Sequence, residues 1–230
     1  MGKETSERIQ TSILNRLEKN ALVWLAERQP VWVTSDMLSY TGVAGAVLFV
    51  VFSYMGNANP HFLWLAALGL VVNWYGDSLD GTLARVRNTQ RPLYGFFIDH
   101  SLDAITTCLI CVGIGVSPYM SMDIALFILA GYLCMSIYTY LSTIIIGKFR
   151  LTYGNLGPTE VRIIVIIVSL LYLYFPLKDT GLEFCGRFWP VYDIVGVAVA
   201  AILFIIYISS MVADLRKLAV QDPAKPFKKG

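Results

Sequence analysis

Charge is the scarcest property of this sequence. Asp, Glu, Lys and Arg supply 15% of its 230 residues, whereas residues of the AVILMFWYC set supply 56%; soluble proteins carry about 25% charged residues. The mean hydropathy is +0.61. Too few residues remain outside the apolar runs to form a large water-soluble catalytic domain. The 18 basic and 16 acidic residues leave a formal charge of +2, which excludes a nucleic-acid binder of the basic-patch kind.

Histidine and cysteine are also rare, with 2 and 4 residues. Cys108 and Cys111 form a C-x-x-C pattern inside an apolar run, where we interpret them as small hydrophobic residues rather than a redox or zinc pair. The sequence has no internal repeat and no pair of similarly broken helices. This absence argues against the inverted-repeat plan of many transporters.

The sequence instead contains several long apolar runs. A bilayer core about 30 Å thick needs roughly 20 apolar residues of helix. Five runs meet or approach that length, and a sixth continues without a proline into a polar segment that we expect to extend the same helix. We therefore predict an all-α integral membrane protein with six transmembrane helices, at residues 37–55, 62–75, 95–116, 124–146, 161–177 and 189–212.

The segments that flank the spans differ in character. Residues 1–36 lack the apolar core of a cleaved signal peptide, but apolar residues recur there at helical spacing among charged ones, which predicts an amphipathic helix lying on the inner leaflet. A helix packed on the cytoplasmic loops is the alternative. The predicted domains are thus this interfacial segment, a six-helix catalytic domain at 37–213 and a basic cytoplasmic tail at 214–230.

The distribution of basic residues predicts the orientation. With six spans, every Lys and Arg except Lys178 and Arg187 falls on the side that holds both termini. An excess of basic residues marks the cytoplasmic side of a membrane protein. We therefore expect both termini to face the cytoplasm in a multi-pass protein.

Four carboxylates gather where the second and third predicted spans meet the cytoplasm. Asp77 and Asp80 are three residues apart, and Asp99 and Asp103 are four apart, so each pair shares one face of its helix. The two helices are antiparallel neighbours, which can pack 8–10 Å apart. We expect both pairs to lie at the same depth in one site.

Four like charges in one cleft must be neutralised by protons or by cations. Hard divalent cations prefer oxygen ligands, and Mg²⁺ typically takes carboxylates together with substrate phosphates. The sequence therefore predicts a divalent-cation site at these carboxylates. The competing interpretation is a set of surface salt bridges to Arg85, Arg87 and Arg91.

Small residues continue the face that carries the carboxylates. Gly81 lies one turn after Asp77, and Ala84 one turn after Asp80, so a nucleotide or diphosphate can approach the backbone there. Arg85 adds a planar donor suited to phosphate. A helix-packing notch is the alternative role for the two small residues.

The run Asp77-x2-Asp80-Gly81-x2-Ala84-Arg85, followed by Gly95-x3-Asp99-x3-Asp103, resembles the signature of the CDP-alcohol phosphotransferases. These are integral membrane enzymes of phospholipid synthesis with a six-helix core, and they often form homodimers. The one departure is the spacing between Arg85 and Gly95, which encloses nine residues where the family usually has eight. The extra residue falls in the loop around Pro92.

The resemblance implies a role for each residue of the signature. Asp77, Asp80 and Asp99 would hold one or two Mg²⁺ or Mn²⁺ ions, and Asp103 would be the catalytic base that also touches a metal. Gly81, Ala84 and Arg85, together with Asp77 and Asp80, would bind the CDP portion of the substrate. Metals make CMP a better leaving group, and a carboxylate accepts the proton of the acceptor hydroxyl.

Two further segments bear on the substrate. Glu160 and Arg162, which follow Gly157-Pro158-Thr159, and His100, in Asp99-His100-x2-Asp103, resemble stretches of choline and ethanolamine phosphotransferases. The alternative is that Thr159 caps a helix and that the charges are ordinary interfacial ones. Lys148, Arg150 and Arg162 are candidates for gathering a phosphorylated acceptor.

These features together predict a Mg²⁺-dependent enzyme that transfers a choline- or ethanolamine-type phospho-alcohol from a CDP-linked donor to a lipid hydroxyl such as that of diacylglycerol, with release of CMP. The alternative within the family is a phosphatidyl transfer from CDP-diacylglycerol to a soluble alcohol. The alternative from another class is a cation- or proton-coupled transporter, for which intramembrane carboxylates are also typical.

Overall fold

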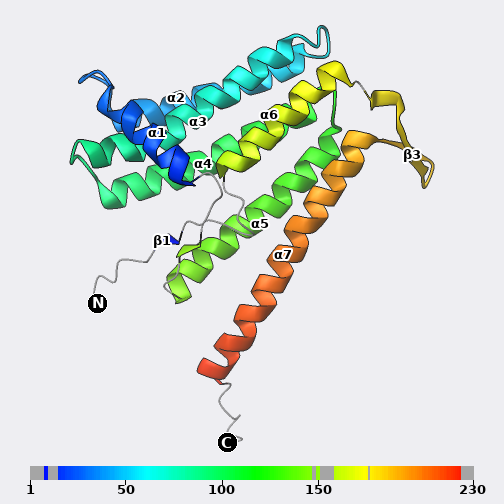
Figure 1. The fold of residues 1–230 in the computed structure, drawn as a ribbon. Coiled ribbons are helices and arrows are strands. Elements are labelled where there is room, and N and C mark those ends of the chain that lie inside the picture. The colour runs from blue at the N-terminus through cyan, green and yellow to red at the C-terminus, as the bar shows by residue number, and fades with distance from the viewer. Residues whose placement is uncertain (1–7, 10–14, 147–148, 151–157, 176, 224–230) are drawn as a thin grey trace, which may run out of the picture.

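The structure, a computed structural model, describes residues 8–9, 15–146, 149–150, 158–175 and 177–223. Helices dominate this part of the chain (Figure 1). They are α1 (Asn15–Glu27), α2 (Ser35–Met55), α3 (Phe62–Val86), α4 (Pro92–Gly115), α5 (Met122–Ile146), α6 (Pro158–Tyr174) and α7 (Val191–Gln221). The predicted all-α fold is confirmed, and α3 is one continuous helix through its polar half, as expected.

Five of the helices, α2, α3, α4, α5 and α7, are long and apolar enough to cross a membrane. Helix α6 has 17 residues and is the shortest of the six helices that correspond to the predicted spans. Large apolar side chains on the outer faces are exposed, among them Phe97, Ile144 and Ile205 at 74%, 79% and 65%. An apolar surface of this extent is typical of a protein that faces lipid. The chain is therefore an integral membrane protein, and α6 as its sixth span stays a prediction.

Glycines let α2 and α3 pack backbone against backbone. A Cβ added at Gly45 would overlap the backbone nitrogen of Asn73, and one added at Gly76 would overlap the backbone nitrogen of Gly42. Small residues at a helix interface permit this close approach in membranes. As a result, the first turns of α2 lie beside the end of α3 that carries Asp77 and Asp80.

The remaining helices are arranged around this pair. Helix α4 packs against α2 and α5, α6 packs against α3, and α5 lies along α7. In Figure 1, α5 and α7 run together and diverge from the group formed by α2, α3, α4 and α6. The acidic segment of α3 and the start of α4 lie at the end of that group near α1.

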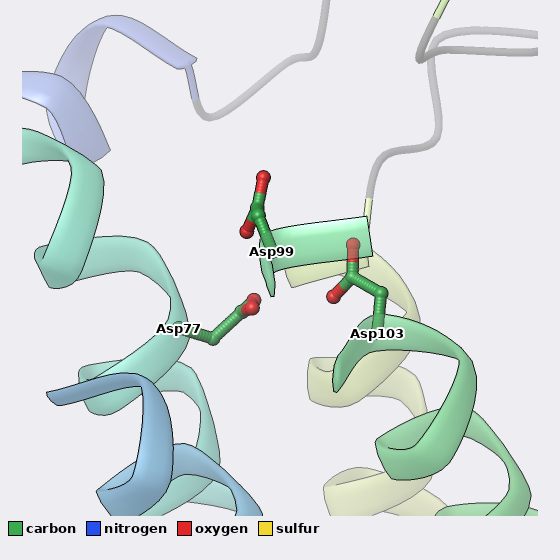
Figure 2. A group of neighbouring side chains, drawn as sticks. All are labelled: Asp77, Asp99 and Asp103. Atoms are coloured by element: carbon green, nitrogen blue, oxygen red, sulfur yellow. The ribbon is translucent and has the colours of Figure 1, made fainter. Parts of the chain in front are cut away.

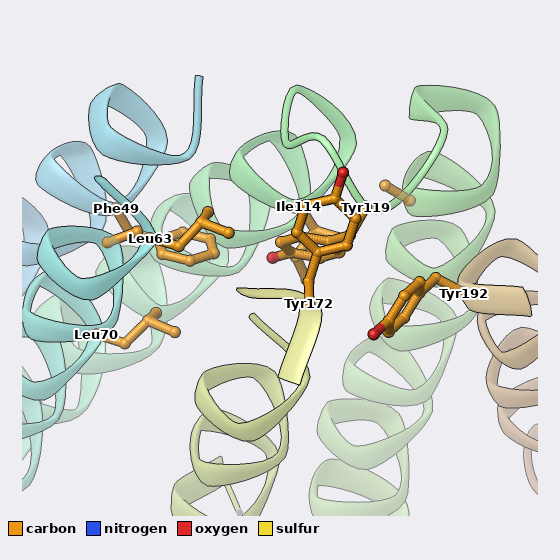
Figure 3. Close-up of a cluster of buried hydrophobic side chains, with 9 residues drawn as sticks. Phe49, Leu63, Leu70, Ile114, Tyr119, Tyr172 and Tyr192 are labelled. Atoms are coloured by element: carbon orange, nitrogen blue, oxygen red, sulfur yellow. The ribbon is translucent and has the colours of Figure 1, made fainter. Parts of the chain in front are cut away.

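The opposite end of the helices is held by an aromatic core and a short hairpin. Tyr119, Tyr172 and Tyr192, labelled in Figure 3, belong to this core. Their ring centroids lie 5.8–6.3 Å apart. Burial raises the pKa of Tyr119 to about 12. The strands β3 (Gly181–Phe184) and β4 (Arg187–Pro190) form an antiparallel hairpin that the sequence analysis did not predict.

Helix α1 lies across the other end of the molecule. Its apolar face, with Leu22 and Ala26, packs on Leu79 and Leu83 of α3. The carboxylate of Glu18 accepts hydrogen bonds from Trp74 Nε1 at 2.8 Å and from Thr159 Oγ1 at 2.6 Å. The predicted amphipathic helix is therefore present, and it is fixed to both α3 and α6.

Two short features complete the described chain. The strands β1 (Arg8–Ile9) and β2 (Phe149–Arg150) pair in parallel, and a single 3₁₀ turn, η1, covers Leu177–Asp179. The boundary predicted between residues 213 and 214 falls inside α7, which continues to Gln221. The division into three domains stays a prediction.

Candidate active site

Three carboxylates meet between α3 and α4. Asp77 of α3 and Asp99 and Asp103 of α4 each offer one oxygen, and these oxygens all lie within 4.8 Å of one another. Figure 2 shows the three side chains pointing toward a common centre. Each of the three residues is partly exposed. A convergent set of three carboxylate oxygens is a donor set that fits a hard divalent cation.

Asp80 belongs to the same pocket but is held differently. It lines a small pocket together with Asp77 and Asp99. Its Oδ2 accepts a hydrogen bond from Ser39 Oγ of α2 at 2.5 Å, and its Oδ1 accepts one from the backbone nitrogen of Gly81. The structure thus brings Asp80 next to the other carboxylates while two protein donors occupy its oxygens.

The guanidinium of Arg162 enters the acidic cluster from α6. Arg162 is buried, and its Nη2 lies 2.6 Å from Asp77 Oδ2. Its Nε donates to Asn73 Oδ1 at 2.8 Å. We expected Arg162 at the membrane surface as a candidate acceptor residue; the structure places it on the first carboxylate of the signature instead.

Two of the arginines near the carboxylates have other partners. Arg87 donates to backbone carbonyls between α1 and α2, those of Gln29 and Pro30 at 2.9 Å. Arg91 pairs with Asp36 at 3.6 Å. The competing interpretation, in which these arginines neutralise the four carboxylates, is therefore wrong for Arg87 and Arg91.

The surface beyond the carboxylates is free of bulk at Gly81. A Cβ placed there would meet only the guanidinium of Arg85, with Nη1 at 3.4 Å. This differs from the glycines of the α2–α3 interface, where a Cβ would meet backbone. Arg85 is exposed and donates to Thr82 Oγ1 at 2.9 Å, and Ala84 is half-buried on the same helix. The packing-notch alternative therefore does not hold for Gly81.

The candidate acceptor residues are not gathered in one place. His100 stacks on Phe96, and its Nδ1 lies 3.7 Å from Asp99 Oδ2. Glu160 is buried at the start of α6. Lys148 lies outside the described residues, and Arg150 lies in β2. A phosphate-binding group of Lys148, Arg150 and Arg162 stays a prediction.

An apolar cavity of about 420 Å³ opens beside the site. Its walls come from α1, α3 and α6, and its lining includes Leu70, Val71, Ile163 and Ile166. Its few polar contributions include Glu18, Thr159 and Arg162. Because Arg162 also contacts Asp77, one side chain joins the apolar cavity to the acidic cluster.

Two residues of the site escaped the sequence analysis. Ser39 holds Asp80, and Asn73 holds Arg162. Both are polar residues inside predicted spans, and a polar group in a membrane helix marks a candidate functional position. That signal was present for Asn73, the one amide in the apolar run at 62–75.

The chain matches the model of the CDP-alcohol phosphatidyltransferase family over residues 32–212. This match covers most of the chain, all four carboxylates, the helices from α2 to α6 and the larger part of α7. The chain belongs to this family.

Curated relatives share the same region. The chain is 30% identical over 180 residues to cholinephosphotransferase 1 of Danio rerio, which covers 73% of this chain and 44% of the relative. It is 28% identical over 156 residues to cholinephosphotransferase 1 of Homo sapiens, covering 64% and 38%. It is 27% identical over 189 residues to the Bos taurus protein of the same name, which covers 76% of this chain and 46% of the relative. The chain spans less than half the length of these relatives.

Proposed function

We propose that this chain is a Mg²⁺-dependent phosphotransferase that moves a choline- or ethanolamine-type phospho-alcohol from a CDP-alcohol to a lipid hydroxyl. The observation that carries the proposal is the meeting of Asp77, Asp99 and Asp103 within 4.8 Å, in a member of the CDP-alcohol phosphatidyltransferase family. The names of the relatives support a choline-type donor.

The carboxylates would hold the metal. Asp77, Asp99 and Asp103, with Asp80 beside them, would bind two Mg²⁺ ions together with the diphosphate of the donor. A bound divalent cation neutralises the diphosphate and lowers the basicity of the departing phosphate. Gly81 leaves room for the nucleotide at the backbone of α3, and Arg85 supplies a planar phosphate donor at that surface.

The chain's own residues would then accept the proton of the acceptor hydroxyl and orient that hydroxyl toward the phosphorus atom. Asp103 accepts the proton of the acceptor hydroxyl. The hydroxyl oxygen forms a bond to the phosphorus that carries the alcohol headgroup, and the bond from that phosphorus to the bridging oxygen breaks. CMP leaves with the electron pair, so the headgroup phosphate ends on the acceptor.

The apolar cavity supports a lipid as one of the two substrates. Its walls belong to α3 and α6, and its end at Arg162 touches the acidic cluster. A diacylglycerol bound there would keep its chains in an apolar environment while its hydroxyl reached the carboxylates. CDP-diacylglycerol would use the same cavity as a donor, so the cavity supports both directions of transfer within the family.

We further propose that the site faces the cytoplasm, with both termini on that side and α6 as the sixth span. The positive-inside distribution of Lys and Arg supports this orientation. A homodimer is proposed only from the resemblance to the family.

The test of function is a panel of substrates. Purified full-length protein in lipid nanodiscs is given CDP-choline, CDP-ethanolamine or CDP-diacylglycerol, with diacylglycerol or a soluble alcohol as acceptor, with and without Mg²⁺. We expect CMP only with Mg²⁺ and a CDP-alcohol plus diacylglycerol. CMP release from CDP-diacylglycerol with a soluble alcohol, and from no other donor, would establish phosphatidyl transfer instead. No CMP from any donor, with cation uptake into vesicles, would favour the transporter.

A further inference from the structure

Asn73 is a fully buried amide in the apolar half of α3. Its Nδ2 donates to the carbonyl of Gly42 on α2 at 2.8 Å, and its Oδ1 accepts from Nε of Arg162 on α6 at the same distance. A buried amide is costly unless both of its ends are hydrogen-bonded. Asn73 satisfies both ends by joining three helices, one turn before Asp77.

The contacts of Arg162 give Asn73 a connection to the acidic cluster. Nε and Nη2 lie on one edge of the planar guanidinium; Nε binds Asn73, and Nη2 binds Asp77 Oδ2 at 2.6 Å. Asn73 and Asp77 are four residues apart and share a face of α3. The guanidinium therefore bridges two successive turns of α3, and Asn73 sets the plane in which it meets the carboxylate.

The charge of Arg162 alone does not explain this arrangement. A lysine would supply the same charge, but it has a compact ammonium group without the planar fork. A buried arginine also requires partners for its donors as well as a counter-charge. Asn73 carries no charge, so its contribution to the site is geometric.

We propose that Asn73 and Arg162 are positioning residues for Asp77. Asn73 fixes the guanidinium of Arg162, and the guanidinium holds the Asp77 carboxylate in the single orientation in which it meets Asp99 and Asp103. Through this pair, the packing of α6 on α3 becomes part of the divalent-cation site. The proposal deepens the proposed function and rests on it for the identity of the site.

The test uses variants that keep the charge of the site. Asn73→Leu removes the amide, and Arg162→Lys removes the fork while retaining the positive charge. The double variant combines them. Ser169→Ala is the matched control, because Ser169 is a fully buried polar residue of α6 whose Oγ donates to Tyr119 at the other end of the helix. Full-length proteins in nanodiscs are compared for Mn²⁺ binding by electron paramagnetic resonance, for thermal stability and for Mg²⁺-dependent CMP release.

We expect Asn73→Leu and Arg162→Lys each to weaken Mn²⁺ binding at least tenfold, while Ser169→Ala binds Mn²⁺ as the unmodified protein does. Because Asn73 acts through Arg162, Asn73→Leu should add less than twofold in the Arg162→Lys background. If Asn73→Leu does not fold, Arg162→Lys carries the test. The proposal is overturned if Arg162→Lys binds Mn²⁺ with wild-type affinity. It is also overturned if the loss of Mn²⁺ affinity in the double variant equals the product of the losses in the two single variants. Weakened Mn²⁺ binding in a protein that releases no CMP would retain the positioning role and reject the proposed function.

Discussion

Asp80 and Asp77 show that the four carboxylates have different surroundings. Asp80 accepts hydrogen bonds from Ser39 and the backbone of Gly81, whereas Asp77 accepts from Arg162. Asp99 and Asp103 converge on Asp77, and Asp80 stands beside them. At the residue scale, the cluster is therefore a set of groups with distinct protein partners.

At this scale, we predict different effects for substitutions at Gly81 of α3 and Gly45 of α2. Gly81→Val should raise KM for the CDP donor roughly tenfold or more, because the added methyl groups enter the open surface beside the carboxylates. The stability of the fold should change little. The measurement is donor-dependent CMP release together with thermal unfolding of the purified variant.

Gly45→Ala is the matched comparison. Its Cβ would overlap the backbone of Asn73 at the α2–α3 interface, so we expect a loss of about 1–3 kcal/mol of stability from overpacking. An unchanged donor KM in Gly81→Val would remove Gly81 from the nucleotide surface. Equal loss of stability in both variants would mean that Gly81 is a packing residue.

Residue identity gave strong information about the acidic site but not about all its partners. The spacing of Asp77, Asp99 and Asp103 predicted a shared site because helix periodicity converts spacing into a common face. The contact between Arg162 and Asp77 joins residues 85 positions apart. It depends on how α6 packs on α3, which no local spacing encodes.

At the scale of elements, one carboxylate adds to the apolar packing that holds α1 on the membrane helices. Glu18 accepts from Trp74 of α3 and Thr159 of α6, and both partners line the apolar cavity with it. The sequence predicted an amphipathic helix here and did not single out Glu18 among its charged residues. Its role follows from tertiary contacts.

Glu18→Ala should therefore loosen α1. Loss of two hydrogen bonds to a partly buried carboxylate is expected to weaken the docking of the helix by about 1–3 kcal/mol. Hydrogen–deuterium exchange of the α1 amides should rise relative to wild type. Lys19→Ala, at an exposed neighbouring position, is the control and should leave exchange unchanged. Equal exchange in both variants would contradict a clamping role for Glu18.

The hairpin β3–β4 is an element that the hydropathy pattern concealed. Its turn holds Cys185 with φ 52° and Gly186 with φ 73°, the left-handed conformation that two-residue hairpin turns require. We included Trp189 in the last span because it is apolar. In the structure, Trp189 instead pairs with Leu182 of β3. This pairing forms only when the chain folds back, so the hydropathy pattern does not indicate it.

At the scale of the whole molecule, the proposed six-span topology puts Cys185 and Lys217, which flank the membrane-spanning part of α7, on opposite sides of the membrane. Cys185 is an exposed free cysteine, whereas Cys111 is buried in α4. In sealed cytoplasm-inside vesicles, a membrane-impermeant maleimide should label Cys185 from outside without permeabilisation. A Cys185→Ser, Lys217→Cys variant should be labelled only after permeabilisation. The opposite pattern would invert the proposed orientation.

We have proposed that the carboxylates of α3 and α4 form a metal-dependent transfer centre. The most direct measurement is Mg²⁺-dependent release of CMP from CDP-choline with diacylglycerol, compared between wild type, Asp99→Asn and Asp103→Asn. We expect wild type to be active only with Mg²⁺, Asp99→Asn to need more Mg²⁺, and Asp103→Asn to lose about 10²–10⁴-fold in rate while still binding nucleotide. Mg²⁺-independent release by wild type would rule out a metal-dependent centre, and full activity of Asp103→Asn would rule out Asp103 as the base.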